Sequence, residues 1–333
     1  LTYASGDSAS RYTDWQENLG AASNKVSGGD FDDLAPDSWR PTGAPVVRFW
    51  PRYLEEVARY NRVEGLYTGV AAAVNFRDAA PGLSLRGSIG IGWTSHSVRG
   101  GVSASLARGS RVHSARVERM LSSTNDFLLT LESGLSLGPL FGGTDDADYV
   151  DRRLAAFSTT QVVRDVDRAL LTVEGALVED RPEIARLDKG VFGNEPYRPN
   201  RNAFAGRYAR GTARLEWHPR VTGESLSPGF GARLTYEVAS GDLDWQRVEA
   251  RLALRQYWHG LVFASRLDAG AVFGSVIPPQ VMYEIGGVHD LASYDYKEFG
   301  GDRAAVGRAL AAYHLPFARS PLRIKRLVLP GVS

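Results

Sequence analysis

Apolar and polar residues alternate with a period of two over much of the chain. In GLSLRGSIGIGWTSH, every leucine, isoleucine and tryptophan from Leu83 to Trp93 lies on one parity, and every serine and arginine lies on the other. Successive side chains of a strand point to opposite faces, so this pattern predicts a strand with one apolar face. Residues 66–76 and 98–106 repeat the alternation and predict a strand on either side of it.

The segment WQRVEARLALRQYW, residues 245–258, alternates in the same way but carries charges on its polar face. The apolar parity holds Val248, Ala250, Leu252 and Leu254, and the charged parity holds Arg247, Glu249, Arg251 and Arg255. Aromatic residues stand at both ends. A face with three arginines and a glutamate does not suit the dry core between two packed sheets.

Further strands are expected near residues 152–163, 167–179, 203–218, 228–238, 261–273 and 303–315. The connections are uneven, and those at 180–202 and 219–228 are long and polar. Long strands that are apolar on one side, charged on the other and aromatic at their ends predict an all-β fold, a transmembrane antiparallel β-barrel with about 12 strands in this chain. The alternative is a soluble sandwich or lipocalin-like barrel, whose strands usually have about 5 to 6 residues.

The beginning of the chain lacks this periodicity. Residues 1–48 are rich in glycine, serine, aspartate and proline, and we interpret them as a linker or loop, the tail of a preceding domain. The barrel is expected over residues 49–333, and a short helix is expected from Tyr53 to Tyr60 in FWPRYLEEVARYNRVEG.

Charge and composition narrow the classes of function. The 333 residues include 39 basic and 38 acidic side chains, so we expect no nucleic-acid partner. The absence of cysteine excludes disulfides, cysteine-bound zinc and thiol catalysis. No run of 18 apolar residues predicts a transmembrane helix.

Motifs for chemistry are few, and we expect neither an enzyme nor a bound cofactor. The six histidines are dispersed and no HExxH occurs, so no metal site is expected. The aspartate-rich stretch GGTDDADYVD, residues 142–151, lacks the central glycine and final glutamate of a calcium loop and is interpreted as a solvated loop. GLSLG at 134–138 places Ser136 at the nucleophile position of G-x-S-x-G, which keeps an outer-membrane serine hydrolase as an alternative, although PLFGG offers no following helix.

The polar and aromatic stretch SYDYKEFGGDR, residues 293–303, lies between a long breaker-rich segment and a late strand. With the preceding IGGVHDLA it resembles a loop of the Omp85 superfamily, the bacterial surface antigen D15 outer-membrane barrels, which carries GG, then Leu/Val-Arg-Gly-Tyr/Phe, then a glycine-rich tail. The matching residues are Gly286, Gly287, Leu291, Tyr294, Phe299, Gly300, Gly301 and Asp302, followed by Arg303 at the start of the strand. Ala292 and Ser293 stand where the family has Arg-Gly.

RYNRVEGLYTG at 59–69, DYVDRR at 148–153 and EFGGDR followed by SPLRIKRLVLPGV resemble a DUF5686-like branch of these barrels over residues 50–333. In that branch the barrel commonly follows a small β domain. The resemblance implies a 16-stranded barrel when complete, so we expect this chain to be incomplete at the C-terminus. It also implies a monomeric barrel in the lipid of the bacterial outer membrane, acting in assembly, insertion or translocation of envelope proteins or lipids.

The charges of the 293–303 stretch are expected in the lumen or at a rim, because a charge facing lipid at mid-depth costs several kcal/mol. Asp295, Lys297 and Glu298 would pair there with residues of the polar parity, and Tyr294 and Phe299 would pack on lumen glycines. The expected partners are Arg86, Arg247, Glu249 and Arg251. The alternatives are a hydrated surface loop, a barrel that only anchors or exports its own N-terminal domain, and an open diffusion channel.

Overall fold

The computed structural model describes residues 43–124, 126–127, 138–142, 145–164, 168–192, 196–223, 227–287, 291, 293–313, 322–324 and 327–329. Several residues used in the sequence predictions lie outside these ranges. They include the linker at 1–42, the serine of the G-x-S-x-G match, Ser136, Ala292 of the loop motif, and parts of IGGVHDLA and SPLRIKRLVLPGV.

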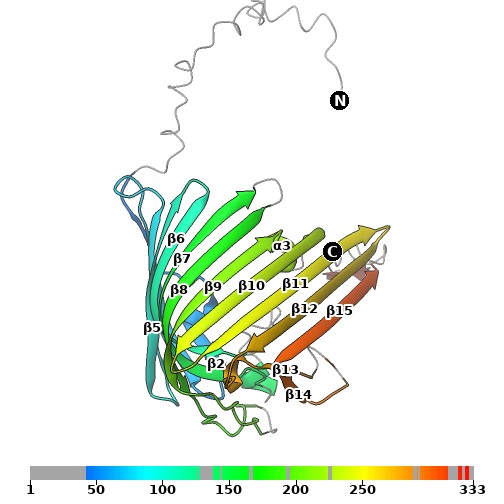
Figure 1. Cartoon of the computed structure of the whole chain (residues 1–333). Helices are drawn as coiled ribbons and strands as arrows, with labels where there is room; N and C mark the ends of the chain where they lie inside the picture. The colour runs from blue at the N-terminus through cyan, green and yellow to red at the C-terminus, as the bar shows by residue number, and fades with distance from the viewer. Residues whose placement is uncertain are drawn as a thin grey trace, which may run out of the picture.

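A single antiparallel sheet of 13 strands dominates the described chain. Its strands are β1 (Val46–Arg48), β2 (Ala58–Asn61), β3 (Gly65–Asn75), β4 (Leu83–Gly92), β5 (Ser97–Arg108), β6 (Arg111–Ser123), β7 (Tyr149–Arg164), β8 (Ala169–Pro182), β9 (Gly206–Trp217), β10 (Gly229–Gly241), β11 (Trp245–Trp258), β12 (Leu261–Phe273) and β15 (Arg303–Tyr313). From β3 to β12 each strand pairs with the next along the chain, β15 pairs with β12, and both β1 and β2 pair with β3. The sheet is strongly curved, with its strands side by side around the curve (Figure 1).

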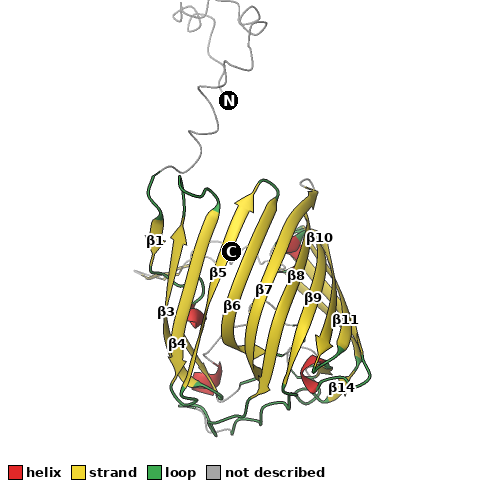
Figure 2. Cartoon of the chain, turned by 60° about the vertical axis from the view of Figure 1, so that its left-hand side comes forward, coloured by secondary structure: helices red, strands yellow, loops and turns green. Residues whose placement is uncertain are grey.

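Small elements complete the described structure. Two-stranded pairs form from β13 (Tyr283–Ile285) with β14 (Phe299–Gly301) and from β16 (Leu322–Ile324) with β17 (Leu327–Leu329). The short helices are η4 (Leu54–Glu56), η5 (Gly138–Gly142), α3 (Pro219–Thr222) and η6 (Pro279–Val281). Figure 2 shows these helices as small red pieces beside long strands. In the described part of the chain, no helix is long and apolar enough to cross a membrane.

The all-β antiparallel fold and the strand count of about 12 are confirmed. The sequence pattern missed β6, because His113 and Arg119 interrupt its apolar parity while Val112 and Met120 lie on its polar one. The expected helix from Tyr53 to Tyr60 is wrong. Only the single turn η4 forms there, and the next residues form β2, whose backbone pairs with β3 at Ala58 and Thr68.

One strand lies inside the stretch interpreted as a linker. β1 pairs with the end of β3, with Val46 opposite Asn75 and Arg48 opposite Ala73. These three residues form a strand because their backbone pairs with β3 at the edge of the sheet. The composition of residues 1–48 does not indicate this pairing.

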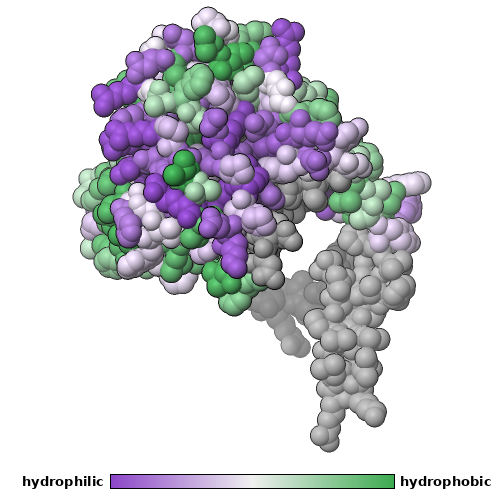
Figure 3. All heavy atoms as spheres, turned by 90° about the horizontal axis from the view of Figure 1, so that it is seen from below, coloured by the Kyte–Doolittle hydropathy of each residue, from purple (hydrophilic) through white to green (hydrophobic). Residues whose placement is uncertain are grey.

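The two faces of the sheet differ in chemistry. On the convex face Val70, Val102, Val117 and Leu177 each expose between 64% and 68% of their surface. The opposite parity lines an interior cavity of about 1460 Å³, whose wall includes serine, arginine and glutamate side chains. Seen from below, hydrophilic residues gather across the middle of the molecule and hydrophobic ones toward its margin (Figure 3).

The connections between strands differ in length between the two ends of the sheet. The three longest, at 124–148, 183–205 and 274–302, all join strands at the end drawn lowest in Figure 1, which we call the lower end. At the upper end the strand connections are shorter, the longest being 218–228. The three long connections therefore all lie at the same end of the sheet.

Aromatic residues fill the interior near the lower end. The Tyr208 ring meets Trp245 edge-on with 4.8 Å between ring centroids, and Phe127 stacks on Tyr283 at 5.1 Å. All four are buried and belong to one apolar cluster. Tyr283 comes from β13, so the 274–302 connection contributes directly to this core.

Candidate functional site

A buried carboxylate joins four segments at the lower end. Asp148 Oδ1 accepts hydrogen bonds from Arg62 Nη2 at 3.0 Å, Arg198 Nη1 at 2.7 Å and the backbone N–H of Arg201 at 3.0 Å. Its Oδ2 pairs with the Lys297 ammonium. Only 1% of the Asp148 side chain is exposed. One carboxylate therefore ties together the β2–β3 turn and all three long connections.

Arg62 is the buried cation of this site. None of its side chain is exposed, and its Nη1 donates to the backbone oxygen of Asp145 at 2.6 Å. Its backbone N–H donates to Asp145 Oδ2 at 2.9 Å, and its backbone oxygen accepts from the N–H groups of Arg186 and Leu187. Arg62 thus binds the 145–148 and 183–205 segments through both main chain and side chain.

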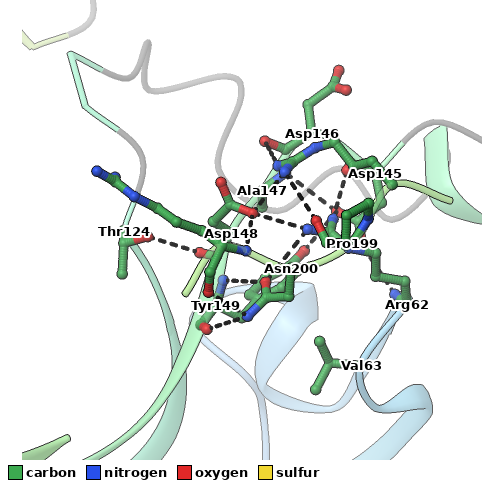
Figure 4. A network of polar contacts seen from close by, with 12 residues as sticks. Arg62, Val63, Thr124, Asp145, Asp146, Ala147, Asp148, Tyr149, Pro199 and Asn200 are labelled. Atoms are coloured by element: carbon green, nitrogen blue, oxygen red, sulfur yellow. Dashed lines mark hydrogen bonds and ion pairs between the residues drawn. The ribbon is translucent and has the colours of Figure 1, made fainter. Parts of the chain in front are cut away.

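An asparagine amide ties the 183–205 connection to the start of β7, beside Asp148 (Figure 4). Asn200 Oδ1 accepts from the Tyr149 N–H at 2.9 Å, and its Nδ2 donates to the backbone oxygens of Tyr149 and Glu183, both at 2.7 Å. The amide satisfies backbone groups that have no strand partner at this point, as buried polar groups require.

The 274–302 connection is held mainly through Lys297 and Glu284. Lys297 Nζ lies 2.9 Å from Glu284 Oε2, and Arg201 Nε lies 3.0 Å from Glu284 Oε1. The Tyr296 hydroxyl donates to the backbone oxygen of Asp146, and the Arg198 guanidinium lies 4.5 Å from the Tyr296 ring centroid. Charges of opposite sign from three connections therefore alternate across the lower end.

A second contact anchors the same connection to the interior wall. Asp126 Oδ1 accepts from Arg247 Nη2 at 2.6 Å, and its Oδ2 accepts from the Glu284 N–H at 3.1 Å. Arg247 Nε also donates to the Tyr283 hydroxyl at 3.0 Å, and its Nη2 donates to Glu249 at 2.6 Å. Burial raises the pKa of Asp126 to about 6 even though Arg247 acts in the opposite direction.

The electrostatics of the network favour its charged form. Burial acts to raise the pKa of Asp148, but the positive charges of Lys297 and Arg198 outweigh it and hold that pKa below its usual value. In the β2–β3 turn the pKa of Glu64 is lowered in the same way by Arg59 and Arg99, against the effect of burial. Both carboxylates therefore remain ionised at neutral pH.

The predicted loop residues lie close together along the 274–302 connection, and two of them adopt a backbone conformation that favours glycine. Gly286 and Gly287 have φ of +140° and +92°, and a Cβ on Gly286 would lie 2.3 Å from the backbone oxygen of Asp295. The Leu291 N–H donates to the Gly287 oxygen at 2.9 Å, and the Tyr294 N–H donates to Leu291 at 3.0 Å. The double glycine is thus needed where the segment folds back on itself.

The tail of the motif is more exposed. Tyr294 and Phe299 meet each other edge-on at 5.1 Å, rather than packing on interior glycines as expected, and both are about half exposed. Gly300 and Gly301 pair with β13. Ser293 is exposed, and the Asp295 N–H donates to Glu298 Oε2 at 3.0 Å. The Asp302 carboxylate lies 3.9 Å from Arg303 Nε.

The expected partners of the loop charges have other contacts in the described residues. Arg86 pairs with Glu56 at 3.0 Å and Arg251 pairs with Asp268 at 2.6 Å. Arg247 and Glu249 do contact the 274–302 connection, but through the Tyr283 hydroxyl. The loop charge that is most strongly held, Lys297, pairs instead with acids of the connections themselves.

The aspartate-rich stretch is where the sequence interpretation was wrong. Asp145 and Asp148 of GGTDDADYVD are 5% and 1% exposed, rather than solvated. The signal was present in the resemblance, because RYNRVEG supplies Arg62 and DYVDRR begins with Asp148, and the structure brings these two together. Asn200 and Arg198 had no such signal, since they lie in a polar connection without periodicity.

Comparison with known proteins adds no family assignment: no family model matches the chain, and no curated protein matches it.

Proposed function

We propose that the chain forms an Omp85-type barrel of the bacterial outer membrane. The support is the convex face, where exposed valine and leucine side chains alternate with polar residues that line the interior. In hydrocarbon an apolar outer face is stabilising and the backbone groups must all be paired, which long paired strands achieve. In water the same face would be a large exposed apolar surface of the kind that soluble monomers avoid.

The lengths of the connections support an orientation. Outer-membrane barrels have short periplasmic turns and long extracellular loops. The lower end, with the connections at 124–148, 183–205 and 274–302, then faces outward, and the upper end faces the periplasm. β1 pairs with the end of β3 that leads into the 76–82 connection of the upper end, in agreement with a periplasmic N-terminal side.

The single observation that carries the functional proposal is the ionic network around Asp148. It binds the 274–302 connection across the lower end through Lys297. An open diffusion channel needs an unobstructed path through the barrel. Buried ion pairs that hold three connections together across the lower end would obstruct that path. We therefore propose a barrel whose outer mouth is gated by this connection and which handles envelope proteins or lipids in their insertion or translocation.

The anchoring alternative is separated from this function by crosslinking in cells. A photoreactive residue at Ser103 lies on the interior wall, and its matched control at Val98 lies on the convex face of the same strand. Specific envelope proteins or lipids captured at Ser103 but not at Val98 support the proposed function. No capture at Ser103, with the barrel folded, supports a barrel that only anchors or exports its own N-terminal domain.

A further inference from the structure

The convex face carries a row of charges directly beside a row of apolar residues. Strand register places Arg119, Arg153, Glu179 and Arg207 opposite one another in turn across β6, β7, β8 and β9. The next row toward the upper end is Val117, Ala155, Leu177 and Ala209, by the same register. Figure 2 shows these four strands side by side on the outer wall.

The two rows line a shallow groove. Its volume is about 700 Å³, and its wall includes all eight side chains of the two rows. In the apolar row the side chains on both sides of Leu177 are small, because Ala155 and Ala209 flank it. In the next row toward the upper end, Gly175 and Gly211 have no side chains, and Phe157 stands beside Gly175. Space for hydrocarbon chains thus lies beside guanidinium groups.

The charged row has more cations than anions. Glu179 is shared by Arg153 at 3.5 Å, Arg181 at 2.6 Å and Arg207 at 3.7 Å. Arg119 pairs with Asp151 at 2.8 Å. Four guanidinium groups therefore stand against two carboxylates, and 76% of the Arg207 side chain is exposed. Arginine binds phosphate oxygens through two parallel N–H donors, which makes this row complementary to a phosphate group.

We propose that this groove is a binding site for an outer-leaflet lipid with a phosphate headgroup. The row of arginines holds the phosphate, and the alanine-flanked row beside it holds the acyl chains. The inference rests on the membrane placement proposed above, in which the lower end of the sheet lies at the outer surface. It adds a ligand to the outer wall, which is separate from the interior network around Asp148.

The test uses two lipids that differ only in the phosphate. Folded protein in detergent is titrated with phosphatidic acid or with diacylglycerol of the same chains, and bound lipid is counted by native mass spectrometry. We expect phosphatidic acid to bind and diacylglycerol to bind at least tenfold more weakly, since an arginine near an anionic lipid surface contributes about 1 kcal/mol.

Two kinds of variant distinguish the contribution of the phosphate headgroup to binding from that of the acyl chains. Arg153→Gln with Arg207→Gln should weaken phosphatidic acid binding about tenfold or more, and Arg207→Gln alone should weaken it about fivefold. Ala209→Phe should weaken it by filling the groove while leaving the arginines in place. The matched control is Arg111→Gln, at the opposite end of β6 on the same exposed parity, which should bind as the wild type does.

Two outcomes overturn the inference. One is equal binding of the two lipids by folded wild type, and the other is full displacement of phosphatidic acid by inorganic phosphate, which would mark a site for free phosphate. Heat-modifiable migration in gels reports folding independently. A wild type without a heat-modifiable folded form in lipid would contradict the proposed membrane function itself.

Discussion

At the scale of single residues, the lower end depends on a few buried charges rather than on many surface pairs. Arg62 and Asp148 are almost fully buried, and each has several partners. An exposed ion pair contributes little to stability, whereas removing one member of a buried pair leaves the other charge without compensation. The strongest mutational effects are therefore expected at these positions.

Replacing the central carboxylate should destabilise the lower end. Asp148→Asn removes the buried negative charge that pairs with Arg62, Arg198 and Lys297, and we expect a loss of about 3 to 5 kcal/mol in the free energy of unfolding. Urea unfolding of the protein folded in lipid measures it. The matched control is Asp188→Asn, at an exposed aspartate of the 183–205 connection whose backbone oxygen accepts from the Tyr197 N–H. Equal stability of the two variants would contradict the role assigned to Asp148.

The raised pKa of Asp126 predicts a pH dependence with a definite sign. The folded-state pKa of about 6 lies above the ordinary value of 3.8, so this group stabilises the fold below pH 4 and loses that contribution as the pH rises through 6. The loss amounts to about 3 kcal/mol. Unfolding of Asp126→Asn at pH 4.5 and 7.5 should show a smaller loss than the wild type over this interval. An unchanged difference between the two pH values would refute the assignment.

At the scale of elements, the strands were predictable and the connections were not. Period-two alternation identified β3, β4, β5 and β11 closely, because each strand has one apolar and one polar face. It failed for β6, where His113 and Arg119 lie on the outer parity, and at β2, where pairing with β3 overrides a helix-like composition. The site residues came from polar segments whose burial depends on contacts with other segments.

The fold-back of the 274–302 connection should depend on its first glycine. Gly286→Ala places a Cβ 2.3 Å from the Asp295 oxygen at a φ of +140°, so we expect a loss of about 1 to 3 kcal/mol and faster proteolysis of the connection. The matched control is Gly300→Ala, where a Cβ meets only the Tyr283 oxygen at 3.9 Å. Equal proteolysis rates for both variants would mean that the connection is not held by this turn.

At the scale of the whole molecule, the ionic network and the conductance of the barrel are linked. If the 274–302 connection closes the outer mouth, reversing the charge of Lys297 should release it, because Asp148 and Glu284 would then repel the new carboxylate. In planar bilayers we expect near-zero steady conductance for the wild type and frequent opening events for Lys297→Glu. The matched control is Lys189→Glu, an exposed lysine of the 183–205 connection. Large steady conductance of the wild type would contradict a gated mouth.

The membrane assignment itself is the central claim, and it makes a residue-by-residue prediction. The chain has no native cysteine, so single cysteines from position 98 to position 106 can each carry a spin label without background. In protein reconstituted in lipid, accessibility to oxygen should peak at positions 98, 100, 102, 104 and 106, which share the outer parity. Accessibility to a polar nickel complex should peak at positions 99, 101, 103 and 105. Uniform accessibility to the nickel complex along the strand would contradict a lipid-facing outer wall.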